Sequence, residues 1–315
     1  MRTKKYIETR LPSLEGKTYV VTGANSGLGF QASKILASKG ARVFLACRSE
    51  KRANEAIEKI KKEVKNAKLE FIEYDQSDYE KITSFCQNLA KLNIKIDGFV
   101  ANAGVYFPPK EKKTKLGYPL TFGVNFVGVY ILIRNLINED VFNSHPTRFV
   151  FVGSVAKALA YPKTFDKWFY DDRVNRNFQY SYSKAGITLL STYLMNEDLN
   201  NVPKMKFPSN VEVYYTHPGI TNTNIVRSNE GGFGKNFVKV AQNFLKIFFQ
   251  SPERASLTMV KALTTEKSGK NISIRPRGPF EISGLPQPRK MNKINKIAAP
   301  RFMDYVENEL SKKSI

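Results

Sequence analysis

Two side chains one helical turn apart could exchange a proton with a ligand near neutral pH. Tyr180 and Lys184 stand four positions apart, so a helix would place both on one face. A tyrosine has a pKa of about 10, and lowering it to about 7 takes about 4 kcal/mol of anion stabilisation. An ammonium about 4 Å away, at an effective dielectric of about 20, supplies about that much. The spacing indicates an acid–base pair, although such a pair taken alone is more often an ordinary surface pair.

A glycine-rich turn is the second chemical feature. Thr22-Gly23-Ala24-Asn25-Ser26-Gly27-Leu28-Gly29 follows an apolar run and opens a helical pattern. Glycines permit a positive φ and the close approach of a phosphate to the backbone, and a helix N-terminus favours an anion. Because Lys and Ser or Thr do not follow the last glycine, a Walker site is excluded. The turn predicts a dinucleotide site; a merely structural strand-to-helix turn is the alternative.

Six apolar runs, with helical patterns between them, must position these residues. The runs are Thr18–Thr22, Val43–Cys47, Leu69–Tyr74, Gly98–Ala101, Arg148–Val152 and Val211–Thr216. The first helix is predicted over Gly27–Lys39, since Gly40 is suited to end it. Strands that alternate with helices imply parallel pairing through right-handed crossovers. The predicted fold class is α/β, a doubly wound parallel sheet with helices on both faces.

The pattern weakens after Pro218. A glycine cluster at Gly231–Gly234 is followed by an amphipathic run over Phe237–Phe249 and by a lysine-rich tail, Pro286–Pro300. No long linker separates these segments from the rest of the chain. We therefore expect a single domain over residues 1–315, in which residues 224–315 form a substrate lid and a C-terminal extension.

Composition excludes several classes of protein. The 315 residues are 42% hydrophobic and 25% charged, which allows a sizeable core and excludes a disordered chain. Cys47 and Cys86 are too few for a disulfide framework or a Cys-rich zinc site. His145 and His217 lack the spacing of metal ligands, so we predict no metal.

The net charge of +22 would attract anions, but the lysines are scattered along the chain. We therefore expect a solvated basic surface and no nucleic-acid partner. The N-terminal residues lack the apolar run of a signal peptide. The longest uncharged stretch, Leu116–Ile133, is near the lower length limit of a membrane span, but Pro119 and Asn125 interrupt it. It predicts a buried helix, and the protein is expected in the cytoplasm, with peripheral membrane contact as an option.

Further motifs follow along the chain in a familiar order. They are Asp75 after the third run, Asn102-Ala103-Gly104 after the fourth, then Asn125, Ser154, the pair Tyr180 and Lys184, and Pro218-Gly219. With these motifs the chain resembles the short-chain dehydrogenase/reductase family over about residues 14–223. The long interval from Ser154 to Tyr180 and the segment Phe165–Trp168 are similar to its retinol-dehydrogenase-like branch. That branch includes WW-domain oxidoreductases and light-dependent protochlorophyllide reductases, but photoreduction is not expected, because no cysteine follows Asn102.

The resemblance implies a Rossmann fold and hydride transfer between a nicotinamide and a carbonyl or alcohol. Tyr180 would give or take the proton, Lys184 would also hold the nicotinamide ribose, and Ser154 would bind the substrate oxygen. Asn125 would position a water molecule that relays protons to Lys184. A homodimer or homotetramer is implied as well. The implied cofactor-binding residues are Gly23, Asn25, Ser26, Gly27, Leu28, Gly29, Arg48, Asp75, Gln76, Asn102, Ala103, Gly104, Tyr180, Lys184, Pro218, Gly219 and Thr223.

Arg48 bears on the choice of dinucleotide. The second run ends in Ala46-Cys47-Arg48-Ser49, which offers no carboxylate to a ribose 2′-hydroxyl. A guanidinium there can bind a 2′-phosphate in bidentate fashion, and charge-assisted bonds of about 1.5–3 kcal/mol imply a preference of about ten- to a hundredfold for NADP. The alternative is an exposed arginine that starts a helix.

The substrate side is less well specified. Phe107, Tyr161, Trp168 and Phe169 could line an apolar pocket for a moderately large substrate, with Phe237–Phe249 as a lid, or they could be plain core. Lys239 and Lys246 on that lid would permit contact with a membrane surface. An alternative from another class is a non-catalytic, NADP-sensing protein that uses its basic surface on a membrane or nucleic acid.

Overall fold

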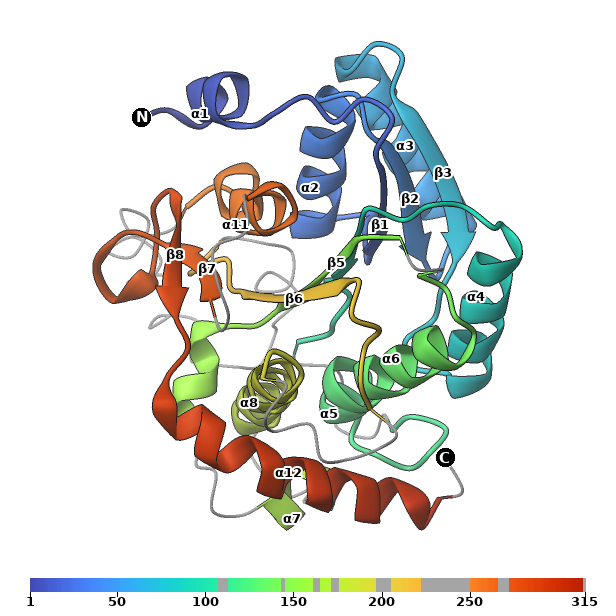
Figure 1. Ribbon diagram of the computed structural model, residues 1–315, viewed down its shortest axis with the longest axis vertical. Helices are drawn as coiled ribbons and strands as arrows, with labels where there is room; N and C mark the ends of the chain where they lie inside the picture. Colours follow the sequence, from blue (N-terminus) through green and yellow to red (C-terminus); the bar gives the residue numbers. More distant parts are fainter. Residues whose placement is uncertain are drawn as a thin grey trace, which may run out of the picture.

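Eight strands form one sheet in the computed structural model of the chain (Figure 1). The structure describes residues 1–106, 113–142, 145–160, 165–170, 176–196, 205–221, 250–265 and 272–313. The strands are β1 Thr18–Thr22, β2 Arg42–Cys47, β3 Lys68–Glu73, β4 Gly98–Ala101, β5 Thr147–Val152, β6 Val211–Thr216, β7 Ile272–Pro276 and β8 Pro286–Lys290. Their order across the sheet is β3-β2-β1-β4-β5-β6-β7-β8.

The first six strands confirm the predicted runs to within one residue, and they all pair in parallel. β1 and β4 are neighbours although two strands, β2 and β3, come between them along the chain, so the winding direction reverses between them. A crevice opens beyond the carboxyl ends of parallel strands at such a reversal. The glycine turn after β1 and the Asn102 turn after β4 both enter this crevice.

The sequence analysis missed β7 and β8. β7 pairs in parallel with β6, and β8 pairs antiparallel with β7 at the edge of the sheet. β8 reads Pro-Gln-Pro-Arg-Lys, which lacks apolar alternation. Prolines and basic side chains are tolerated on an edge strand, because one side of its backbone needs no partner. The strand is therefore specified by pairing with β7 rather than by its own pattern.

Helices cover both faces of the sheet (Figure 1). On one face lie α1 Thr3–Arg10, α2 Gly27–Ser38, α3 Glu50–Glu63 and α11 Pro252–Thr264. On the other lie α4 Tyr79–Lys91, α5 Leu120–Phe122, the π-helical turn Gly123–Val127, α6 Gly128–Asn138, α7 Phe165–Tyr170, α8 Arg176–Leu194 and α12 Lys293–Ser311. Short 3₁₀ turns occupy Val155–Leu159 and Pro279–Glu281. The predicted doubly wound α/β class is confirmed.

The C-terminal helix α12 closes the second face by packing across α8 (Figure 1). Phe302 lies at its centre, with its ring centroid 5.1 Å from Phe126, 5.0 Å from Phe165 and 5.4 Å from Trp168. Trp168 and Phe169 are fully buried in this cluster. These two aromatics therefore belong to the core, which was the alternative to a pocket lining. Phe107, Tyr161 and the predicted lid helix 237–249 lie outside the described residues.

The long apolar stretch forms the continuous helix Leu120–Asn138, through α5, the π-helical turn and α6. Within the described part of the chain, this one helix is long and apolar enough to cross a membrane, and 78% of its apolar window is buried inside the protein. Burial against the sheet accounts for its apolar composition, as the sequence predicts for a core helix.

Candidate active site

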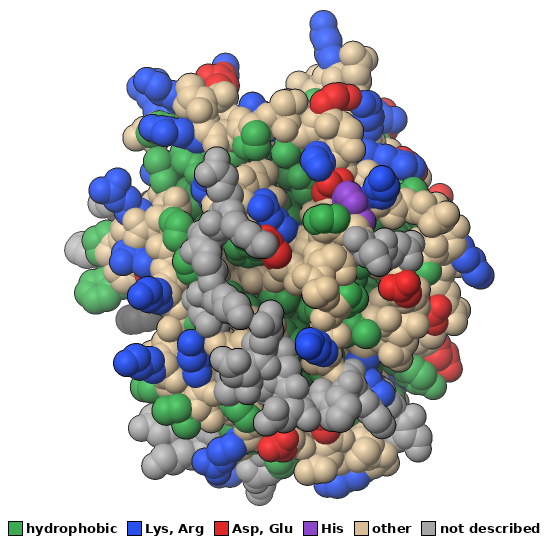
Figure 2. Space-filling model, in the orientation of Figure 1, with side chains coloured by type: hydrophobic (Ala, Val, Ile, Leu, Met, Phe, Trp, Pro, Cys, Tyr) green, Lys and Arg blue, Asp and Glu red, His purple; other side chains and the backbone are tan. Residues whose placement is uncertain are grey.

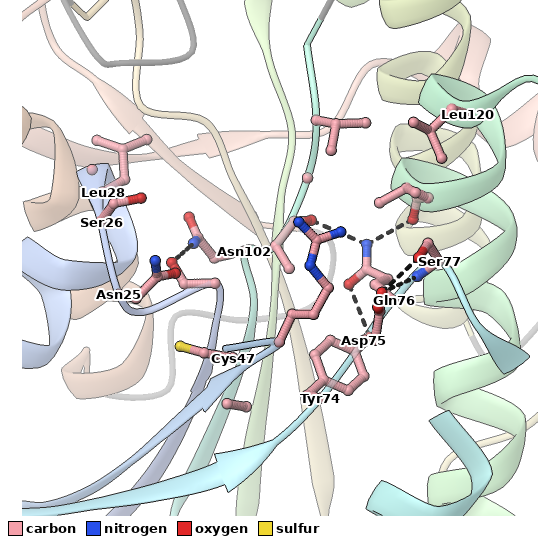
Figure 3. A pocket seen from close by; sticks show the side chains of 18 residues that line it. Asn25, Ser26, Leu28, Cys47, Tyr74, Asp75, Gln76, Ser77, Asn102 and Leu120 are labelled. Carbon is pink, nitrogen blue, oxygen red and sulfur yellow. Dashed lines mark hydrogen bonds between the residues drawn. The ribbon is translucent and has the colours of Figure 1, made fainter. Parts of the chain in front are cut away.

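A groove of about 260 Å³ lies beyond the carboxyl ends of β1, β2, β3 and β4 (Figure 3). Asn25, Ser26 and Leu28 stand on one side of it, and Tyr74, Asp75 and Gln76 on the other, with Asn102 between them. The other lining residues are Gly23, Gly27, Ala46, Cys47, Arg48, Ser77, Ala103, Gly104, Val105, Leu120 and Val124. Most of the predicted cofactor residues are thus brought together at one place.

The glycine turn is shaped for close approach. Gly23 has φ +65°, and a Cβ there would stand 2.9 Å from the Cα of Ala103. A Cβ on Gly29 would stand 2.5 Å from the carbonyl oxygen of Gly23, so Gly29 packs the helix against the strand rather than lining the groove. The Ser26 side chain makes no capping bond to α2, which leaves the first-turn N–H groups to an incoming anion. These features fit a dinucleotide pyrophosphate.

Thr22 ties this turn to the end of β4. Its hydroxyl accepts hydrogen bonds from the backbone N–H groups of Asn102, at 3.0 Å, and of Ala103, at 2.9 Å. The Asn102 side chain donates to the Thr22 carbonyl at 2.9 Å. The sequence analysis quoted Thr22 in the turn but did not assign it to the site. Its position just before the first glycine was the available signal.

Gln76 joins three elements instead of presenting its amide to the groove. Its Nε2 donates to the carbonyl oxygens of Val124, at 2.7 Å, and Ala103, at 3.1 Å, and its Oε1 accepts from the Tyr74 hydroxyl. The neighbouring Asp75 accepts from the backbone and hydroxyl of Ser77 through one oxygen, Oδ1. Asp75 lines the groove with its carboxyl group, whereas Gln76 holds the walls of the groove together.

Arg48 follows β2 at the outer end of the groove. It is exposed and also lines a second, shallow cleft of about 300 Å³ with Asn25, Ser49 and Arg52. Ser49 caps α3 by accepting from the Arg52 N–H, and both residues line this cleft together with Arg48. Two guanidinium groups and an amide around one small cleft form a site with the chemistry of a phosphate receptor.

Tyr180, on α8, and Ser154, which follows β5, share a hydrogen bond between their side chains. The Tyr106 ring packs edge-on against the Tyr180 ring, with centroids 4.7 Å apart and planes at 82°. Tyr106 directly follows Val105, a lining residue at one end of the groove. The groove therefore leads toward the Ser154–Tyr180 pair. Sequence analysis did not assign Tyr106, which no motif marks.

The pKa values of Tyr180 and Lys184 differ from those expected from their spacing alone. Burial raises the pKa of Tyr180 to about 12, while the hydrogen bond to Ser154 lowers it. Burial also lowers the pKa of Lys184 to about 8, and its Nζ donates to the Val152 carbonyl at 2.9 Å. The expected lowering of the Tyr180 pKa toward neutrality by Lys184 is contradicted by this arrangement, because burial outweighs the hydrogen bond to Ser154.

Asn125 lies in the π-helical turn and clamps the loop after β4. Its Oδ1 accepts from the Val105 N–H at 2.7 Å, and its Nδ2 donates to the Val105 carbonyl at 2.8 Å and to the Ser183 hydroxyl at 3.2 Å. Ser183 in turn donates to the carbonyl of Tyr180. Asn125 therefore connects the groove to α8, and its side chain fixes the backbone of Val105 in the loop after β4.

The remaining predicted residues follow β6. Pro218 and Gly219 are buried, and Gly219 has φ +72°; Thr223 lies outside the described residues. Among the described residues, no three His, Cys, Asp or Glu side chains gather as a metal site. Burial raises the pKa of the Cys47 thiol to about 11, so it is not a thiolate at neutral pH.

Comparison with known proteins agrees with this geometry. The short chain dehydrogenase family matches residues 17–232. The chain is 34% identical to retinol dehydrogenase 14 of Mus musculus over 225 residues, and 33% identical to retinol dehydrogenase 12 of Homo sapiens over 214 residues. Each alignment covers 68% of this chain and 64% of the relative. A chloroplastic short-chain dehydrogenase of Brassica napus, TIC 32 B, is 28% identical, with 80% of this chain and 77% of the relative covered.

Solved structures show the same fold at lower identity. An uncharacterized protein from Mycobacterium paratuberculosis superimposes with a TM-score of 0.68 at 23% identity, covering 93% of this chain and 92% of its own. Actinorhodin polyketide ketoreductase with NADPH superimposes with a TM-score of 0.59 at 16% identity, covering 81% and 93%.

Proposed function

Because this chain belongs to the short-chain dehydrogenase/reductase family, in its retinol-dehydrogenase-like branch, we propose that it is an NADP(H)-dependent oxidoreductase. It would interconvert a carbonyl and an alcohol on a moderately large, apolar substrate. The observation that carries the proposal is the hydrogen-bonded pair of Ser154 and Tyr180 on two different elements, beyond one end of a groove shaped for a pyrophosphate.

The chain's own groups support proton transfer at the substrate oxygen. With a pKa of about 12, the Tyr180 hydroxyl keeps its proton at neutral pH and can donate it to the oxygen of a carbonyl. Ser154, bonded to the same hydroxyl, would hold that oxygen by a second hydrogen bond. The dinucleotide supplies or accepts the hydride when bound. A protonated phenol at neutral pH favours reduction over alcohol oxidation.

Arg48 supports NADP over NAD. The cleft that it forms with Asn25, Ser49 and Arg52 adjoins the dinucleotide groove, and among the residues that the structure describes no acidic side chain lines this cleft. A 2′-phosphate would receive charge-assisted hydrogen bonds there, whereas a 2′-hydroxyl would meet donors without a carboxylate acceptor. Arg48, Asp75 and the Asn102-Ala103-Gly104 turn would bind the adenosine half, and Tyr180, Lys184 and Pro218-Gly219 the nicotinamide half.

The surroundings of Tyr180 support an apolar substrate. The edge-on ring of Tyr106 gives the phenol an aromatic neighbour on the side of the groove. The similarity to proteins named retinol dehydrogenases points to the same class of substrate. The lid proposed within residues 224–315 would cover this side; its helix, 237–249, is outside the described residues.

We also propose a cytoplasmic, single-domain protein that forms a homodimer or homotetramer and contacts membranes at most peripherally. Support comes from the single sheet and from Lys and Arg side chains that are spread over the visible face instead of gathered in one patch (Figure 2). Such a distribution favours a solvated surface over a docking site for nucleic acid or lipid. Sedimentation with anionic vesicles would test the membrane contact, and light scattering would test the oligomeric state.

The function is tested with a panel of aldehydes, ketones and retinoid- or sterol-like carbonyls, followed at the NADPH absorbance. We expect turnover of one or more large apolar carbonyls. Activity confined to small polar sugars would overturn the substrate class. NADP binding without turnover of any carbonyl, together with salt-dependent affinity for RNA or vesicles, would instead support the non-catalytic sensor.

A further inference from the structure

A partly buried cluster of His217, Arg275 and Glu281 lies at the carboxyl end of β6, outside the groove. His217 Nε2 lies 2.8 Å from Glu281 Oε2, and Arg275 Nη1 donates to both oxygens of Glu281 at 3.2 and 3.3 Å. The side chain of His217 is 1% exposed and that of Glu281 is 27% exposed. Arg275 is on β7 and Glu281 is in the 3₁₀ turn that follows, so the C-terminal segment brings both groups to His217.

The hydrogen bonds define the state of the histidine. Gly219 N–H donates to His217 Nδ1 at 3.3 Å, so Nδ1 accepts and the ring proton is on Nε2, where it is donated to Glu281. Burial lowers the pKa of His217, with Arg275 and Lys157 acting in the same direction against Glu281. The hydrogen bond from His217 lowers the pKa of Glu281 to about 2. The pair is therefore a neutral imidazole bound to a carboxylate.

The same C-terminal segment holds the turn after His217 at three further points. The Gln250 side chain donates to the Pro218 carbonyl and accepts from the Gly284 N–H. The Ile220 N–H donates to the Ile282 carbonyl at 2.8 Å. A Cβ on Gly219 would stand 2.2 Å from that carbonyl oxygen, so the two backbones are in close contact.

This turn stands next to the proton-transfer pair. Thr216 pairs with Val152 across β5 and β6, and the Gly153 N–H donates to the Thr216 carbonyl at 2.7 Å. The residues that follow, His217-Pro218-Gly219 on one strand and Ser154 on the other, therefore leave the sheet side by side. Contacts that fix the His217-Pro218-Gly219 turn therefore also fix one wall of the site beside Ser154.

We propose that Glu281, acting through His217, is a positioning residue that holds the Pro218-Gly219 turn where it meets the nicotinamide half of the dinucleotide. The inference rests on the proposed function and adds to it a residue far along the chain, outside every motif of the sequence. Glu281 orients the imidazole of His217, and the imidazole in turn accepts a hydrogen bond from the Gly219 N–H. The conformation of the Pro218-Gly219 turn is therefore fixed before a dinucleotide binds. Loss of Glu281 would weaken contacts to the nicotinamide half and leave the adenosine half unchanged.

The test compares two ligands by titration calorimetry on the purified full-length chain: NADP⁺, and adenosine 2′,5′-bisphosphate, which lacks the nicotinamide. For Glu281→Ala we expect about tenfold weaker binding of NADP⁺, since a charge-assisted hydrogen bond is lost, and binding of the bisphosphate within about twofold of wild type. Glu281→Gln keeps an acceptor for His217 and should weaken NADP⁺ binding by about threefold. This variant provides the test if the alanine variant does not fold.

Glu212→Ala is the matched control. Glu212 is on β6, at the end of the strand opposite to His217, and its Oε2 lies 3.4 Å from Nε of Arg148 on β5. Glu212→Ala should leave the affinities for both ligands unchanged. Unchanged NADP⁺ binding in a folded Glu281 variant would overturn the inference, and so would equal losses for both ligands, which indicate general loosening. Failure of the wild type to bind either ligand would contradict the proposed function itself.

Discussion

The ammonium of Lys184 lies 5.7 Å from the centre of the Tyr180 ring and donates to the carbonyl oxygen of Val152. The two residues share a helix face, as their spacing requires, but the lysine is anchored to the end of β5. Burial then acts on both groups in opposite directions, raising the pKa of the phenol and lowering that of the ammonium. Both shifts favour the uncharged forms, as expected in a desolvated site.

The first prediction concerns Tyr180→Phe. Removing the hydroxyl should reduce carbonyl turnover by about 10²- to 10⁴-fold, because proton donation is lost, while NADPH binding stays within about twofold. Stopped-flow turnover and NADPH fluorescence measure the two effects. The control is Tyr182→Phe on the same helix, where Tyr182 stacks on Trp168 at 5.3 Å in the core cluster. Substantial turnover by Tyr180→Phe would remove this residue from the mechanism.

The second prediction concerns Arg48→Asp. A carboxylate there repels a 2′-phosphate and accepts from a 2′-hydroxyl, so the ratio of kcat/KM for NADPH over NADH should fall by about ten- to a hundredfold or more. Lys59→Asp makes the same change of charge on the exposed side of α3 and should leave the ratio unaltered. An unaltered ratio in Arg48→Asp would mean that the cleft beside β2 does not select the cofactor.

The third prediction is a pH dependence. Alcohol oxidation needs the phenolate of Tyr180, whose pKa of about 12 makes the ionised fraction grow with every unit of rising pH. The rate constant for oxidation should therefore climb about tenfold per unit between about pH 7 and 10. Reduction uses the protonated phenol, which dominates throughout this range. An oxidation rate that levels off below about pH 8 would show that the reacting phenol is acidified after all.

The fourth prediction concerns Gln76→Met. The change leaves the carbonyls of Val124 and Ala103 and the hydroxyl of Tyr74 without their partner in a buried place, and each such loss costs about 1–3 kcal/mol. We expect the free energy of unfolding in urea to fall by about 3 kcal/mol or more. Gln87→Met, which removes an exposed bond to Glu139, should change it by less than about 0.5 kcal/mol. Equal effects would show that Gln76 is not a joint between the walls.

Much of the fold could be predicted because its signals are local. Each buried parallel strand, such as β1 or β4, is a short apolar run bounded by turn residues, and α2 begins at a glycine turn and ends near Gly40. The glycine turn itself is encoded by φ requirements and by the lack of room for a Cβ at Gly29. Such features depend on neighbouring residues, so the chain determines them before it folds.

Other features exist only after distant segments meet. β8 has no strand pattern and forms because β7 offers it an edge. Gln76 and Asn125 connect separate elements because their side chains form hydrogen bonds to residues far away in the sequence. Glu281 reaches His217 from 64 positions along the chain. The order and types of the residues are enough to predict which groups can move a proton and where an anion can bind. The pKa values of those groups follow only from the folded packing, because desolvation depends on everything packed around a group rather than on its neighbours in sequence.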